Sequence, residues 1–230
     1  MRLTRSSVAA LSLALVTATV MAAGAHSLKE LESQLVDREK YFQPIDKDTP
    51  GFELRDAAGR TVQLADFQDK VVVLHFIYTT CPDVCPLHAD RIAQIQEMVN
   101  QTAMKDQVQF VSITTDPEND TAEVLRTYGP THGLDPVNWV FLTSGSDRPS
   151  ATRELAERYG HKFTKTEGGY QMHGVVTHVI AREGRWRANF HGLKFNPTNL
   201  VLLVNALVND VPNGHGNEEQ SLWDKLWNLF

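Results

Sequence analysis

Cysteine is rare in this sequence, and its two cysteines lie close together. Cys81 and Cys85 are separated by three residues. A thiolate is the nucleophile of disulfide exchange and also a ligand for soft metal ions, so a close thiol pair favours redox chemistry or metal binding. Residues four apart share one face of a helix, and both sulfur atoms can therefore converge on one ion. An inert disulfide is the alternative, but it would close a very short loop and add little stability.

A metal site needs a further ligand beyond two sulfur atoms, and the nine histidines are its natural source. His178 is the first candidate because it lies in the apolar segment VVTHVI, which predicts a buried strand. His173 lies five residues earlier, so in a continuous strand it faces the other way, although Gly174 relaxes that rule. A lone histidine in an apolar strand is often a hydrogen-bonded core residue, and that alternative stays open for His178.

The N-terminus has the layout of a secretory signal peptide. Arg2 and Arg5 precede an uncharged stretch whose centre, residues 8–20, is mostly Ala, Leu and Val, and Ala23-Gly24-Ala25 fits the A-x-A cleavage pattern. We expect cleavage after Ala25 and a mature protein in the periplasm or otherwise exported. An uncleaved anchor is the alternative, because the uncharged stretch approaches the roughly 20 residues that a membrane-spanning helix needs.

Export bears on both the redox state and the metal. In an oxidising compartment a close thiol pair becomes oxidised unless a reductant or a metal protects it. A site of two cysteines and one histidine suits copper there, because thiolates select Cu(I) and imidazole accepts either copper state. Zinc is the alternative, but a structural zinc site usually takes four protein ligands and the sequence offers no fourth candidate. The sequence leaves open whether Cu(I) or Cu(II) is the working state.

The elements around the cysteines must position them. Residues 71–78 (VVVLHFIY) predict a central strand buried on both faces, and residues 87–104 carry apolar residues at helical spacing. The thiols therefore lie where a buried strand turns into a helix, and the positive end of the helix dipole favours thiolate. His75 on the strand is expected in the core, and His88 on the helix is expected at the surface.

Along the rest of the chain, strands alternate with helices, which predicts an α/β protein with a layered sheet. The predicted elements are hairpins over 52–64 and 177–190, strands over 108–113 and 139–142, a helix or lead-in arm over 26–43, and helices over 122–128, 149–159 and 197–208. Asn196 and Pro197 give the last helix an N-cap and a proline in its first turn.

Composition excludes several functional classes. With 230 residues, 42% hydrophobic and 22% charged, the chain is an ordinary globular protein rather than a disordered, collagen-like or multi-span membrane protein. The net charge of -6 lacks the basic footprint of nucleic-acid binding, so no nucleic-acid partner is expected. The sequence has no recognisable Ser/His/Asp arrangement and no Gly-rich phosphate loop after a strand.

The segment TTCPDVCP, residues 79–86, is similar to the Sco/SenC family of copper-binding, thioredoxin-like proteins involved in assembling cytochrome c oxidase. The resemblance runs from about Gly51 to about Asp210 and includes VSITTDPENDT and VTHVIAREGRW. It implies a thioredoxin-like α/β fold, with a central mixed sheet flanked by helices and an N-terminal β-hairpin. It also implies that Cys81, Cys85 and His178 bind copper.

The resemblance further implies a partner protein and a biochemical function. The expected function is an exported copper metallochaperone, not itself an enzyme, that helps assemble the CuA site of cytochrome c oxidase subunit II or serves another copper protein. The alternative is a thiol–disulfide oxidoreductase in which Cys81 and Cys85 are the redox-active pair and reduce the cysteines of a copper-site target.

The predicted organisation has four parts: a signal peptide or anchor (1–25), an N-terminal arm (26–50), a thioredoxin-like copper-binding domain (51–210), and a spacer with an amphipathic tail (211–230). In the tail, five apolar side chains would form one stripe on a helix: Leu222, Trp223, Leu226, Trp227 and Phe230. Packing against the domain is one interpretation of this stripe, and docking to a membrane surface or a partner is the other.

Overall fold

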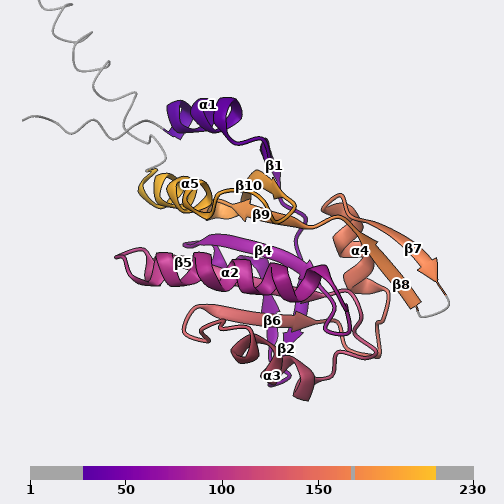
Figure 1. The fold of residues 1–230 in the computed structure, drawn as a ribbon. Helices are drawn as coiled ribbons and strands as arrows, with labels where there is room; N and C mark the ends of the chain where they lie inside the picture. Colours follow the sequence, from indigo (N-terminus) through magenta and orange to yellow (C-terminus); the bar gives the residue numbers. More distant parts are fainter. Residues whose placement is uncertain (1–27, 167–168, 211–230) are drawn as a thin grey trace, which may run out of the picture.

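The computed structural model describes residues 28–166 and 169–210, which build an α/β layered fold (Figure 1). The strands are β1 (Phe42–Asp48), β2 (Glu53–Asp56), β3 (Thr61–Gln63), β4 (Val71–Ile77), β5 (Val108–Thr114), β6 (Trp139–Thr143), β7 (Lys162–Thr166), β8 (Gly169–His173), β9 (Val176–Ile180) and β10 (Arg185–His191). The helices are α1 (Leu28–Arg38), α2 (Val84–Asn100), α3 (Ala122–Thr131), α4 (Ala151–Arg158) and α5 (Pro197–Asn209), with short 3-10 turns η1 (Leu64–Phe67), η2 (Lys105–Gln107) and η3 (Arg182–Gly184).

Eight strands form one mixed sheet in the order β1-β10-β9-β4-β5-β6-β2-β3. The central strands β4, β5 and β6 run parallel, and β9 pairs with β4 in the antiparallel sense. Every residue of β4 and β5 is buried, as expected for strands covered on both faces. The predicted α/β class and mixed central sheet are confirmed, and the predicted hairpin after residue 51 is the antiparallel pair β2–β3.

The two faces of β4 pack against different helices. Val73 belongs to a core cluster with residues of α2 and α5, whereas Leu74 belongs to a second cluster with Leu155 of α4 and with Trp186. Successive side chains of a strand alternate between faces, so a residue's position in β4 decides which helix layer it meets. The helix α5 begins as predicted, because the Asn196 side chain accepts a hydrogen bond from the Thr198 N–H and Pro197 follows the cap.

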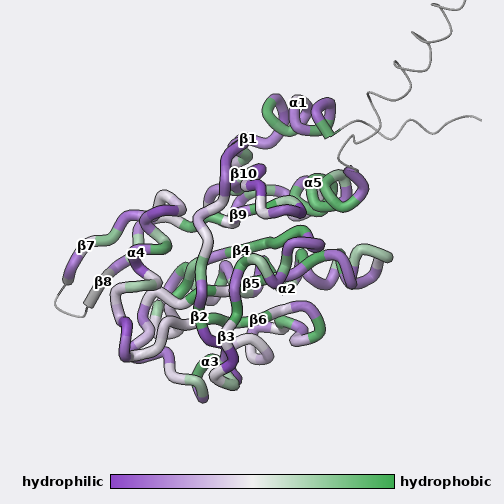
Figure 2. The backbone as a smooth tube through the Cα atoms, turned by 180° about the vertical axis from the view of Figure 1, so that it is seen from behind, coloured by the Kyte–Doolittle hydropathy of each residue, from purple (hydrophilic) through white to green (hydrophobic). Residues whose placement is uncertain are grey.

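Two parts of the fold were not predicted. The strand β1 lies within the predicted arm and pairs with β10 at one edge of the sheet, and β7 and β8 form a separate two-stranded sheet. Figure 2 shows why β1 gives a weak signal, since β4 and β5 are largely hydrophobic and β1 is largely hydrophilic. An edge strand that buries little carries no alternation that would identify it.

Within the described residues, no helix combines the length and the apolar character that crossing a bilayer requires. The predicted signal peptide (1–25) and the predicted amphipathic tail (221–230) lie outside the described residues.

Candidate functional site

Both cysteines lie at the junction of β4 and α2, as the sequence predicts. Cys81 precedes α2 and is 6% exposed, and Cys85 lies in its first turn and is 2% exposed. The Cys85 backbone N–H points at Cys81 Sγ, with 3.4 Å between nitrogen and sulfur. Both thiols are free, and an apolar cluster that includes Leu125 and Phe141 surrounds them.

The two thiols have opposite protonation preferences. Burial alone would raise the pKa of Cys81, but hydrogen bonds from the backbone N–H groups of Asp83 and Cys85, from the Cys85 thiol and from the Tyr78 hydroxyl lower it overall. Burial raises the pKa of Cys85, and the neighbouring Cys81 and Asp120 raise it further. Thiolate is therefore favoured at Cys81 relative to Cys85, whose thiol holds its proton more tightly.

A buried carboxylate fixes the loop that leads to the cysteines. Asp120 accepts hydrogen bonds from the hydroxyls of Thr79 and Thr114 and from the Thr79 backbone N–H. Asp120 is 1% exposed, and burial raises its pKa despite these hydrogen bonds. The contacts tie the end of β4 to the end of β5, and they hold the backbone two residues before Cys81.

Beneath the thiols lies a buried polar pair that the sequence revealed only in part. His75 is fully buried as predicted, whereas His88 was expected at the surface and is 2% exposed. Their ring centroids are 4.7 Å apart, and His88 Nε2 lies 2.9 Å from Thr177 Oγ1 of β9. The prediction for His88 was wrong because its polar partner comes from a strand 89 residues further along the chain.

The structure does not bring His178 to the thiols. His178 lies in the middle of β9, opposite Leu74 of β4, on the face that α4 covers. Ile77 packs with both cysteines, and its three-residue separation from Leu74 places it on the other face of the strand. Within residues 28–166 and 169–210, no three side chains of His, Cys, Asp or Glu are grouped to hold a metal ion.

Both nitrogen atoms of His178 are occupied by other side chains. The Trp186 indole can only donate and lies 3.0 Å from Asn189 Oδ1, so this oxygen is an acceptor. It therefore also accepts the proton of His178 Nδ1, at 2.7 Å. The His178 Nε2 lone pair then accepts from His161 Nε2–H, at 3.0 Å. Burial, together with His161, lowers the pKa of His178 and keeps it neutral.

His173, the other histidine considered from the sequence, lies at the end of β8 and is exposed. Its Nε2 lies 2.6 Å from Thr164 Oγ1. Gly174 follows with a φ of 83°, a left-handed conformation that favours glycine, and β9 begins two residues later. Because β9 is antiparallel to β4, its start lies beside the end of β4, from which the cysteine loop leaves. The chain therefore enters β9 at the same end of the sheet from which the cysteine loop leaves β4.

Comparisons with known proteins agree on one family. The family model SCO1/SenC matches residues 43–209. A Bacillus subtilis relative called SCO1 protein homolog is 26% identical over 156 residues, which cover 67% of this chain and 79% of the relative.

The fold of this chain is similar to that of solved Sco structures. A structure of Bradyrhizobium japonicum ScoI with copper bound is 27% identical, with a TM-score of 0.58, over 70% of this chain and 99% of that one. A structure of BsSco, described as having a disulfide switch and as a member of the Sco family of cytochrome c oxidase assembly proteins, has a TM-score of 0.64. At 23% identity, over 72% of this chain and 96% of that one, it supports the fold alone.

Proposed function

This chain belongs to the SCO1/SenC family, and on that premise we propose that it is a copper metallochaperone that takes up copper at Cys81 and Cys85. Its thioredoxin-like fold is the one predicted, and the predicted copper cargo agrees with the copper-bound structure of a relative. The observation that carries the proposal is the pair of free, nearly buried thiols at the first turn of α2, one of them favoured as thiolate.

The donor set fits a soft ion. Thiolates select Cu(I), and the two thiols lie close together, one just before α2 and one in its first turn, with Cys85 N 3.4 Å from Cys81 Sγ. Cys81 is prepared for binding because its pKa is lowered, whereas Cys85 must release its proton. Copper uptake is therefore expected to release a proton from Cys85 and to strengthen as the pH rises.

We propose an imidazole as the third ligand, and two histidines compete for the role. His178 is the candidate from the sequence and from the family resemblance. For His178 to bind at Nε2, His161 would have to move away and the ring would have to reach the opposite sheet face. His173 is exposed at the end of β8, just before the turn at Gly174 that leads into β9 beside the end of β4, so a movement of this loop could bring it to the thiols.

Copper titration of the reduced full chain, followed by thiolate-to-copper absorption, tests the proposal. We expect stoichiometric binding, abolished in Cys81→Ser and Cys85→Ser and weakened in the variant that removes the true third ligand. His178→Ala and His173→Ala are compared directly, with Ala103→Leu, an exposed change that removes no metal-ligating group, as the control. Unchanged affinity in both candidate variants would refute an imidazole ligand, and unchanged binding in the cysteine variants would refute the site.

The asymmetry of the thiols supports a second function, a thiol–disulfide oxidoreductase. The Cys81 thiolate would attack a disulfide of a target protein, form a mixed disulfide and release one target thiolate. Cys85 would then give up its proton and attack Cys81 Sγ, which releases the second target thiolate and leaves a Cys81–Cys85 disulfide. The target is reduced and this chain is oxidised, so each cycle needs an external thiol reductant. Exchange that persists in both histidine variants would favour this function over copper transfer.

We propose the CuA site of cytochrome c oxidase subunit II, or another exported copper protein, as the target. Membership of the SCO1/SenC family supports an oxidase partner, because the Sco/SenC proteins that this sequence resembles are involved in assembling cytochrome c oxidase. Export through the signal peptide at 1–25 is part of the same proposal, with the periplasm as the expected compartment. Mass spectrometry of the mature N-terminus checks it, and a chain that retains residues 1–25 would support an anchor.

A further inference from the structure

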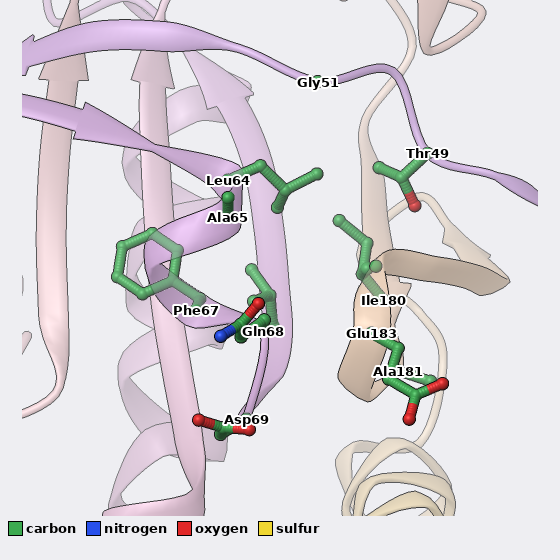
Figure 3. Close-up of a pocket in the computed structure, with 12 residues that line it drawn as sticks. Thr49, Gly51, Leu64, Ala65, Phe67, Gln68, Asp69, Ile180, Ala181 and Glu183 are labelled. Carbon is green, nitrogen blue, oxygen red and sulfur yellow. The ribbon is translucent and has the colours of Figure 1, made fainter.

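A cavity of about 610 Å³ lies at the opposite end of β4 from the cysteines (Figure 3). Val72 at the start of β4 and Ile180 at the end of β9 line its apolar floor. In Figure 3 the Leu64 side chain of η1 faces Thr49 and Ile180 across the open space. The short 3-10 turns η1 and η3 form its walls, together with Thr49 and Gly51.

The cavity combines an apolar interior with polar groups that lack partners. Thr49 Oγ1 is buried and has no hydrogen-bond partner within the described part of the chain. Asp69 and Glu183 are exposed, project from opposite walls at one end of the cavity, and form no ion pair with another described residue. The Thr49 hydroxyl is shielded from the open space, so the apolar floor and the two carboxylates decide what fits: the cavity suits an apolar group with a cation beside it.

The last described residue, Asp210, lies close to this cavity. Asp210 follows the last residue of α5 and lines a neighbouring cavity of about 300 Å³, which shares Ala181 and Glu183 with the larger one. Residues 211–220 separate that point from the amphipathic segment 221–230. A flexible linker of this length spans on the order of 18 Å on average and about 35 Å when extended. The segment can therefore reach the cavity next to which α5 ends.

We propose that residues 221–230 (SLWDKLWNLF) dock in this cavity of their own chain. Their stripe offers Leu222, Trp223, Leu226, Trp227 and Phe230 to the apolar floor. Trp223 and Trp227 supply large apolar area for this floor. Lys225 is the only cation of the segment and complements the carboxylates of Asp69 and Glu183.

Distance measurement between two nitroxide labels tests the docking. Labels are attached to Gln68→Cys on the cavity wall and to Asn228→Cys in the full chain, in a Cys81→Ser/Cys85→Ser background that has no other cysteine. Docking predicts one narrow population of short distances. We expect this population to be lost in Trp223→Ser/Trp227→Ser and also in Gly51→Leu, which places a side chain in the cavity.

Gly51 lines the cavity, and a Cβ there meets no atom within 4 Å, so Gly51→Leu adds an apolar side chain to the cavity wall without disturbing the core. Ala103→Leu adds the same side chain at an exposed position away from the cavity and should retain the narrow population. Leu64→Ala removes a wall side chain without filling the cavity, and it should reduce the narrow population of distances without abolishing it. Circular dichroism establishes that each variant is folded.

Three other results would overturn the proposal. A narrow population that survives Gly51→Leu would place the segment elsewhere on the domain. A population that disappears on dilution with unlabelled protein would indicate docking onto a second copy. A broad distribution that narrows only with vesicles of phosphatidylglycerol and phosphatidylcholine would indicate a membrane surface as the partner.

Discussion

Cys81 and Cys85 are one helical turn apart, yet their surroundings give them different chemistry. Several donors stabilise a thiolate at Cys81, and burial with neighbouring negative charge disfavours one at Cys85. This division suits both proposed functions, because disulfide exchange needs one attacking thiolate and copper uptake can begin at one sulfur atom. Cys81 is also the slightly less buried thiol of the two.

The two thiols should differ in their rates of alkylation. Near neutral pH we expect iodoacetamide to react with Cys85→Ser, which retains Cys81, at least about tenfold faster than with Cys81→Ser, because each unit of pKa changes the thiolate population about tenfold. The rate is measured from pH 5 to 10 by mass spectrometry. Unfolded protein in urea is the control and should show equal rates. Equal rates in the folded variants would contradict the assignment of Cys81 as the thiolate.

Asp120 is expected to matter for stability and for the loop before Cys81. Asp120→Ala leaves the hydroxyls of Thr79 and Thr114 without their acceptor, and each such buried group costs about 1–3 kcal/mol. Urea unfolding should show a loss of at least that size. Asp120→Asn keeps the shape and one acceptor oxygen and should lose less. If Asp120→Ala unfolds at the same urea concentration as the wild-type chain, these hydrogen bonds do not anchor the loop.

Residue types and spacing were enough to find the thiols but not to place the histidines. The position of the cysteines depends on local sequence, a buried strand followed by a helix. His178 instead forms hydrogen bonds with His161 and Asn189, which lie 17 and 11 residues away along the chain. Contacts of this kind depend on the register of the sheet. His173 lies on the unpredicted β8, so its position relative to the thiols was not available from the alternation rule.

Among the elements, α5 was predicted almost to the residue because its start is encoded locally. The Asn196 side chain caps it at 3.0 Å from the Thr198 nitrogen. Asn196→Ala should therefore lower the free energy of unfolding by about 1 kcal/mol, as measured in urea. Asn196→Ser should preserve most of the stability because serine is also a good N-cap. Equal stability of Asn196→Ala and wild type would show that packing of the apolar face of α5, and not the cap, fixes the helix start.

The strand β1 shows the limit of local sequence. Its sequence FQPIDKD lacks strand alternation, and only Phe42 is buried. The strand forms because β10 presents an open edge, and Phe42 then packs against Phe190 with ring centroids 5.3 Å apart. Edge strands of this kind are determined by the sheet they join, which explains why the predicted arm contains a strand that its own residues do not indicate.

Across the whole molecule, buried histidines should make stability sensitive to acid. Burial lowers the pKa of His75 to about 3 and that of His161 to about 4, from an ordinary value of 6.5. Both are neutral in the folded protein, and the unfolded chain binds their protons below pH 6.5. Their contribution is complete above pH 6.5 and is lost as the pH falls towards 4 and then 3. Asp120, with its raised pKa, acts in the opposite sense.

The free energy of unfolding should therefore fall between pH 6.5 and 4, by about 1.4 kcal/mol per pH unit for each of these histidines. Urea unfolding at intervals of half a pH unit measures the slope. His75→Leu removes one titrating group, so its slope should be shallower by about 1.4 kcal/mol per pH unit, whatever its stability at pH 7. Val72→Ala, a buried change on the same strand that removes no titrating group, serves as the control and should leave the slope unchanged. A His75→Leu slope equal to that of the wild-type chain would mean that His75 takes up its proton in the folded protein, and the packing of β4 against α2 would then have to open to admit water.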